Sequence, residues 1–179
     1  LDIETHFEFS VWGAGHVLQV ANVAAMLAVW MWLMKRATGQ SLFAPRQANM
    51  VFGTLIAPHF IMPILTLRGP LDTIYHSGAT FLMRWCIFPV TLFVLIRGVQ
   101  HLQRHRAGIS TWTQKMARSG FYASAGLTLF GFILGACIRS STTLVPAHYH
   151  ASLGGITAAF MAAAYLILAD IAERKTGDS

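Results

Sequence analysis

Five apolar stretches, each of about 20 residues, constrain the fold of this chain more than any other feature. They lie at Phe9–Leu33, Ala48–Leu67, Tyr75–Ile96, Phe121–Ile138 and His148–Ala169. An apolar helix of about 20 residues spans the hydrocarbon core of a bilayer and satisfies its own backbone hydrogen bonds there. Hydrophobic residues occupy 55% of the 179 positions and charged residues only 11%, against about 25% charged in soluble domains. The sequence therefore predicts an all-α integral membrane protein, a single domain over residues 1–179 built as a bundle of five transmembrane helices.

The spans carry two further local signals. The spans contain Pro58, Pro63 and Pro89, so we expect kinks there, tolerated where neighbouring helices satisfy the freed carbonyls. Small residues recur at every fourth position of the last span, where Gly154, Ala158 and Ala162 form one ridge and Gly155, Ala159 and Ala163 form another. Because such ridges allow helices to approach closely, we expect this span to pack tightly against a neighbouring helix.

The distribution of lysine and arginine predicts the orientation of the chain in the membrane. The connections Lys35–Gln47 and Arg97–Gly120 hold three and five of these residues, whereas Arg68–Ile74 and Arg139–Ala147 hold one each. Cytoplasmic loops are the ones enriched in positive charge. We therefore expect the N-terminus outside and the C-terminus in the cytoplasm. The net charge of +6 is explained by these loops, and we expect no nucleic-acid partner.

Two histidines at the start of the fifth span carry the strongest chemical signal. His148 and His150 are separated only by Tyr149, and successive helical residues turn about 100°. Their rings therefore point about 200° apart and cannot bind one small metal ion together. Each can bind a different large, flat cofactor on its own side of the helix, and ionisable residues inside a membrane mark candidate functional sites. This arrangement indicates two haems.

Three further histidines fall at a similar depth in the expected topology. His16, His59 and His76 belong to the first three spans and, like His148 and His150, lie in the outer half of the membrane. We interpret these three, together with His148 and His150, as a candidate functional cluster. The remaining histidines lie before the first span or in the connections, and we interpret them as solvated side chains. No catalytic residue is identified by the sequence.

These motifs resemble the large catalytic subunit of the haem-copper oxygen reductases and their relatives, the nitric oxide reductases. Ala147-His148-Tyr149-His150, followed by Ser152-Leu153-Gly154, is similar to the His-aromatic-His motif that begins the tenth helix of that family. The segment from Phe9 to Val17, which contains His16, resembles the start of the sixth helix. The segment Ala57-Pro58-His59-Phe60 falls where the seventh helix carries two adjacent histidines. The resemblance covers nearly the whole chain. The five spans match helices six to ten, which lie in the C-terminal half of the family's members.

The resemblance implies a respiratory oxidoreductase that reduces oxygen or nitric oxide at a site formed by a haem and a metal. It implies that His148 binds the iron of a high-spin haem and His150 the iron of a low-spin haem. Copper or another metal is implied at His16 and His59, and His76 is the candidate for a third ligand, because this chain has one histidine where the family has two. The implied partners are other membrane subunits of a respiratory complex, with cytochrome c or a quinol as electron donor, in a bacterial inner membrane.

Two alternatives remain open. The second interpretation, after the catalytic one, is a non-catalytic haem-binding anchor that passes electrons within a larger membrane complex and has lost the copper. The isolated His59, and Val20 at a position where many oxidases have a tyrosine, favour that alternative, whereas His16 favours the catalytic one. A structural subunit whose histidines bind nothing is the third interpretation.

Arg84 requires its own explanation. It lies about ten residues into the third span, and none of the five spans contains an acidic residue to pair with it. Since a charge at this depth is costly in lipid, we expect Arg84 to face water, a cluster of carbonyl groups or a partner subunit. A role in proton access or in binding an anionic group and a role in subunit contact both remain open.

Overall fold

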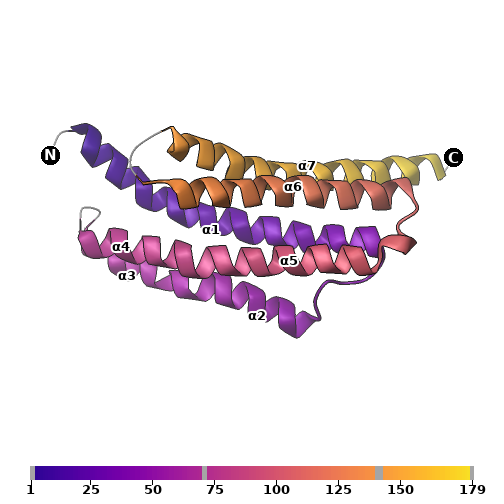
Figure 1. Cartoon of the computed structure of the whole chain (residues 1–179), viewed down its shortest axis with the longest axis horizontal. Coiled ribbons are helices and arrows are strands. Elements are labelled where there is room, and N and C mark those ends of the chain that lie inside the picture. The colour runs from indigo at the N-terminus through magenta and orange to yellow at the C-terminus, as the bar shows by residue number, and fades with distance from the viewer. Residues whose placement is uncertain (1–2, 70–71, 140–142, 178–179) are drawn as a thin grey trace. The chain divides into compact units, whose positions relative to one another are not determined.

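The computed structural model describes residues 3–69, 72–139 and 143–177, with the side chains of residues 3–14, 16, 17 and 175–177 outside that description. The described residues form helices and no strands (Figure 1). The α-helices are α1 (Ile3–Thr38), α2 (Pro45–Ile56), α3 (Met62–Thr66), α4 (Thr73–Leu82), α5 (Phe88–Arg104), α6 (Trp112–Cys137) and α7 (Leu144–Gly177). Three short turns of other helix types are η1 (Ala57–Ile61), η2 (Met83–Ile87) and η3 (Arg106–Gly108).

Five helical segments of the described chain are long and apolar enough to cross a membrane, as the sequence predicts. They are Leu18–Thr38, Pro45–Thr66, Thr73–Arg104, Trp112–Cys137 and Leu144–Arg174. The helices continue beyond the expected spans, so most of the connection expected at Arg97–Gly120 is helical. Basic residues in a last helical turn are stabilised by the helix dipole, and α5 ends at such a residue, Arg104.

Two of the three prolines at which kinks are expected lie in or next to turns that are not α-helical. Pro58 lies in η1, a 3-10 turn in which the amide N–H of Met62 donates to the carbonyl of His59, three residues back. Pro89 follows η2, a π turn in which the amide N–H of Phe88 donates to the carbonyl of Met83, five residues back. Because proline cannot donate to the carbonyl four residues before it, the chain uses other spacings at these places.

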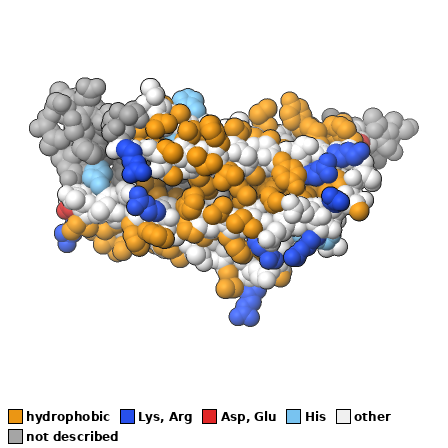
Figure 2. Space-filling model, viewed as in Figure 1, with side chains coloured by type: hydrophobic (Ala, Val, Ile, Leu, Met, Phe, Trp, Pro, Cys, Tyr) orange, Lys and Arg blue, Asp and Glu red, His pale blue; other side chains and the backbone are white. Residues whose placement is uncertain are grey.

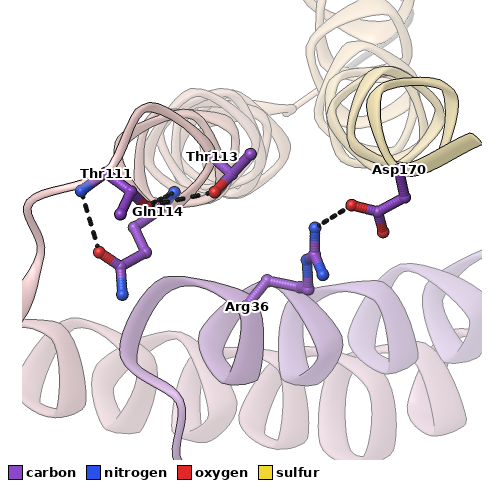
Figure 3. Close-up of polar contacts among 5 residues, drawn as sticks. All are labelled: Arg36, Thr111, Thr113, Gln114 and Asp170. Atoms are coloured by element: carbon purple, nitrogen blue, oxygen red, sulfur yellow. Dashed lines mark hydrogen bonds and ion pairs between the residues drawn. The ribbon is translucent and has the colours of Figure 1, made fainter. Parts of the chain in front are cut away.

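Side-chain and glycine caps set the ends of several helices. The Thr111 hydroxyl accepts from the Gln114 amide N–H at 3.3 Å, and the Gln114 side chain accepts in return from the Thr111 amide N–H at 3.1 Å (Figure 3). This reciprocal pair is a capping box and starts α6 nine residues before the expected span. Gly39 follows α1 with φ +76° and Gly69 follows α3 with φ +99°, conformations that glycine adopts without steric cost.

The described contacts divide the chain into two compact units. Unit 1 comprises Leu1–Ala25 and Phe43–Val94, and unit 2 comprises Met26–Leu42 and Leu95–Ser179. In unit 1, α3 packs against α4 through a buried apolar cluster. Its members are Met62, Tyr75, Ala79 and Leu82, with Leu65 and Cys86 packed against them.

Unit 2 is held together by a polar chain that crosses three helices. The Trp30 indole Nε1–H donates to the Ser124 hydroxyl at 2.8 Å, and that hydroxyl donates to the carbonyl of Gly155 at 2.6 Å. Trp30 also meets the ring of Phe121 edge-on, with 5.3 Å between the ring centroids. Both aromatic side chains are fully buried. These contacts join the second half of α1 to α6 and α7.

Helices α6 and α7 of unit 2 lie side by side (Figure 1) and approach closely at glycines. A Cβ atom added at Gly120 would collide with Ala162, and one added at Gly131 would lie 2.5 Å from the hydroxyl oxygen of Ser152. The close packing expected for the fifth span is therefore present. It is formed by glycines of α6 as well as by the small residues of α7.

An ion pair also joins α1 and α7 within unit 2. The Arg36 guanidinium lies 2.6 Å from the Asp170 carboxylate (Figure 3) and 5.6 Å from the centre of the Trp32 ring. Each charged side chain is about one third exposed. The pair neutralises the one acidic residue that lies directly after the fifth expected span.

The surface of the described chain is predominantly apolar. Hydrophobic side chains are spread over much of the face seen in Figure 2. Leu67 is 86% exposed and Phe60 is 75% exposed. Large exposed apolar surfaces are characteristic of membrane or protein contact regions, so this surface is compatible with an integral membrane protein.

Candidate functional site

His148, in the second turn of α7, has its ring held by a hydrogen bond to another helix. Its Nδ1 atom lies 2.7 Å from the carbonyl oxygen of Gly131 in α6. A carbonyl can only accept, so Nδ1 must carry the proton, and in the neutral ring Nε2 then carries a lone pair. No hydrogen bond to Nε2 is found in the described part of the chain. A neutral imidazole with one nitrogen fixed by a carbonyl is the form that binds iron or copper.

Two glycines of α6 make room for this ring. Gly131 supplies the carbonyl, and a Cβ atom added at Gly135 would lie 2.9 Å from both Cε1 and Nδ1 of His148. The imidazole is therefore packed against the backbone of α6 and is half-buried. Helix packing within unit 2 thus determines both the orientation and the tautomer of His148.

His150 has similar ring chemistry in a different environment. Its Nδ1 donates to the carbonyl of Pro146 at 2.7 Å, one turn earlier on the same helix. The residue is exposed, whereas His148 is half-buried between helices. The difference agrees with the sequence argument that the two side chains occupy different sides of α7. Both rings present Nε2 as the nitrogen available for a ligand.

His59, in η1 of unit 1, has a buried nitrogen without a partner. Its Nδ1 donates to the carbonyl of Leu55 at 2.8 Å. Its Nε2 is enclosed and makes no hydrogen bond within the described residues. Nearly all buried polar atoms in proteins have a hydrogen-bond partner. The unpaired Nε2 of His59 therefore marks a candidate position for a ligand. The Nε2 lone pair of His59, like that of His148, can bind a metal ion, including the iron of a haem.

An apolar cavity of about 410 Å³ lies beside His59. All of its described lining residues belong to unit 1 and, apart from His59, they are apolar: Val20, Ala21, Ala24, Ile56, Phe60, Met62, Pro63, Ala79 and Met83. A pocket with apolar walls and one polar anchor is typical of a small-molecule or cofactor site. His59 is therefore placed to bind a ligand that is mostly apolar or a gas.

Of the other two predicted metal ligands, only His76 has a side chain that the structure describes. The side chain of His16 lies outside the described residues. His76 lies on α4, where it meets the ring of Tyr75 edge-on at 5.4 Å between centroids and lines a polar groove rather than the cavity. Among the described side chains, no group of three or more His, Cys, Asp or Glu could hold a metal ion. The three-ligand site of His16, His59 and His76 thus stays a prediction.

The sequence identified these histidines but missed the groups that orient them. The acceptor for His148 is a backbone carbonyl of another helix, which no residue pattern specifies. Gly131 and Gly135, one turn apart on α6, are the only visible signal. The walls of the cavity come from segments far apart in the chain, so spacing within one helix could not reveal them.

Comparison with known proteins finds distant relatives only. An uncharacterised protein of Aquifex aeolicus (strain VF5) is 22% identical over 170 residues, which cover 95% of this chain and 40% of the relative. An uncharacterised protein of Rickettsia prowazekii (strain Madrid E) is 22% identical over 194 residues, covering 92% of this chain and 37% of the relative. The chain therefore spans about two fifths of the length of these relatives. No family profile and no solved structure matches the chain.

Proposed function

We propose that this chain is a haem-binding membrane subunit of a respiratory oxidoreductase, in which His148 is an axial ligand of the haem iron. One observation carries the proposal: the hydrogen bond of 2.7 Å from Nδ1 of His148 to the carbonyl of Gly131 on α6. In the neutral ring, this bond places the proton on Nδ1 and the lone pair on Nε2, and it orients the ring against α6. Axial ligation by an oriented imidazole is how many proteins tune haem.

The chain contributes binding, orientation and exclusion of water to this chemistry. When bound, the haem would supply redox chemistry and the capacity to bind a diatomic gas at its iron. The absence of a side chain at Gly135 leaves the space that the His148 imidazole occupies against α6. His150, on the other side of α7, is proposed to bind a second haem.

His59 is proposed to bind a metal, copper being the first candidate, together with His16 and His76. Its buried, unpaired Nε2 supports this role, and the apolar cavity beside it suits an uncharged substrate such as oxygen or nitric oxide. Reduction of one of these gases is the proposed activity. The proposed setting is a bacterial inner membrane, with other respiratory subunits as partners and cytochrome c or a quinol as electron donor.

Metal analysis and optical spectra of the purified protein test the proposal. We expect iron bound as haem, and a shift of the reduced spectrum when carbon monoxide is added. Iron and copper together support gas reduction, whereas iron without a carbon monoxide shift supports the electron-transfer alternative. A protein purified from haem-replete cells without any haem would overturn the proposal.

Single substitutions distinguish the two sides of α7. His148→Gly should abolish carbon monoxide binding, and added imidazole should restore it if the fold is intact. His150→Ala should keep that signal and lose any six-coordinate haem band. His105→Ala is the matched control, because His105 also donates from Nδ1 to a carbonyl one turn back, that of His101 at 2.8 Å, but lies at the opposite end of the spans. Equal losses from all three variants would count against ligation by His148.

A further inference from the structure

A polar groove of about 510 Å³ runs along α4 and into η2 of unit 1. Its polar side chains include Thr73, Ser77, Thr80 and Arg84. Their spacing of four, three and four residues places them on one face of the helix. The stripe thus runs from the first residue of α4 down to Arg84. The π turn η2 ends it there, because the extra residue rotates the helix that follows.

Arg84 lies deep within a segment that is long and apolar enough to cross a membrane. At about 1.5 Å per residue, it stands about 16 Å along the helix from Thr73, near the middle of a hydrocarbon core of about 30 Å. Its guanidinium is charged at any physiological pH. At this depth the guanidinium is not surrounded by bulk water. Another part of the protein must therefore supply water or a counter-ion.

Within the described residues, nothing neutralises Arg84. The residue is exposed, and no ion pair or hydrogen bond involves its side chain in the described part of the chain. The one carboxylate among the described side chains of unit 1 is Asp72, which lies at the start of α4 and caps it by accepting from the amide N–H of Ile74 at 2.7 Å. The rise of the helix separates Asp72 from Arg84 by about 18 Å.

Large exposed apolar side chains flank the stripe. Phe81 is 60% exposed and Trp85 is 61% exposed. This surface has apolar edges, small hydroxyl side chains and one charge near mid-membrane depth. Such a composition is typical of a contact between membrane helices, where polar side chains form hydrogen bonds across the interface. Lipid tails offer nothing that could accept the donors of Arg84 or of the threonines.

We infer that this groove docks another membrane-spanning helix, one that carries an aspartate or glutamate opposite Arg84. Charge complementarity identifies the occupant. A carboxylate can accept two parallel hydrogen bonds from the guanidinium fork, and such pairing is how charges inside membranes are ordinarily accommodated. The small side chains of Ser77 and Thr80 leave space for the approaching helix. This inference does not depend on whether the chain binds haem.

Photochemical cross-linking in native membranes tests the inference. A photoreactive amino acid is placed at Phe81, beside the groove, and in a separate variant at Ile64, which is 64% exposed on α3. Mass spectrometry then identifies the residue that is captured. From position 81, we expect an apolar helix with Asp or Glu within one turn of the cross-linked residue. From position 64, we do not expect that helix. Capture of lipid alone, or of a helix without a carboxylate, would overturn the inference.

Substitution of Arg84 makes the same test quantitative. Arg84→Gln should lower the yield of the cross-link from position 81 roughly tenfold, as loss of a strong polar contact predicts, whereas Arg84→Lys should retain most of it. Replacing the captured carboxylate with its amide should have the effect of Arg84→Gln. Exchange of the two charges, with Arg84→Glu in this chain, should restore the yield. An unchanged yield in the Arg84→Gln variant would show that the groove is filled for another reason.

Discussion

His148 differs from three other histidines of the described chain in the origin of its hydrogen bond. His59, His105 and His150 each donate from Nδ1 to the carbonyl four residues back in the chain. Any helical histidine can form that bond with a suitable rotamer. The ring of His148 instead bonds to Gly131, 17 residues away on α6. Its orientation is therefore a property of helix packing, and mutations that move α6 should change its chemistry.

Gly135→Ala tests this dependence directly. The added methyl group would lie 2.9 Å from two atoms of the His148 ring, closer than van der Waals contact allows, so the imidazole must shift. We expect haem affinity to fall roughly tenfold, equivalent to about 1.4 kcal/mol, with a displaced Soret band. Titration of the apoprotein with haem measures both.

Gly126→Ala is the matched control for that experiment. Gly126 lies on the same helix and has nothing within 4 Å of an added Cβ. This variant should bind haem normally and be more stable by up to about 1 kcal/mol, because alanine is the better helix former. Wild-type haem binding in the Gly135→Ala variant would mean that the contact with α6 does not position His148.

At the scale of helices, the number and place of the spans could be predicted from the sequence, but their ends could not. Runs of apolar residues are what a bilayer requires, so they locate the spans. A span defined by apolar residues ends where the charged residues begin, as the third expected span ends directly before Arg97. Helices continue through such residues when the dipole or a cap stabilises the end. The capping box of Thr111 and Gln114 is such a case, and hydrophobicity does not reveal it because it precedes a polar stretch.

The packing face of α7 was predicted only in part. Two ridges of small residues were expected, each with four-residue spacing. The structure buries Gly155, Ala159, Ala162 and Leu166, a stripe that takes members from both ridges. An α-helix has 3.6 residues per turn, so a straight contact face must alternate spacings of four and three. The regular spacing of small residues therefore predicts that α7 packs closely, but it does not predict which face of α7 is buried.

The chain of hydrogen bonds from Trp30 through Ser124 to Gly155 should stabilise the three-helix packing of unit 2. Ser124→Ala removes both bonds from a buried site, so the free energy of unfolding in detergent should fall by about 1–2 kcal/mol. Ser119→Ala, an exposed serine on the same helix, should change it by less than about 0.5 kcal/mol. The double variant Trp30→Phe with Ser124→Ala should lose less than the sum of the single losses. Strict additivity would show that the two side chains are not coupled.

At the scale of the whole molecule, the predicted orientation awaits measurement. In a variant with Cys86 and Cys137 replaced by serine, a cysteine at Thr143 should react with an impermeant maleimide added from outside intact cells, because its connection carries little positive charge. A cysteine at Ser110, among the basic residues between α5 and α6, should react only after the membrane is permeabilised. Reversed labelling would place the N-terminus inside and move the five predicted ligand histidines to the cytoplasmic half.

The glycine contacts between α6 and α7 have a consequence for biosynthesis. The two helices are consecutive in the chain and are joined by a short connection, so they can meet as soon as the ribosome has released both. Their interface depends on small residues of the pair itself, at Gly120 with Ala162 and Gly131 with Ser152. Helices that pair in this way can leave the insertion machinery together as a hairpin. The imidazole of His148 would then be oriented, with its proton already assigned, before any cofactor reaches the membrane.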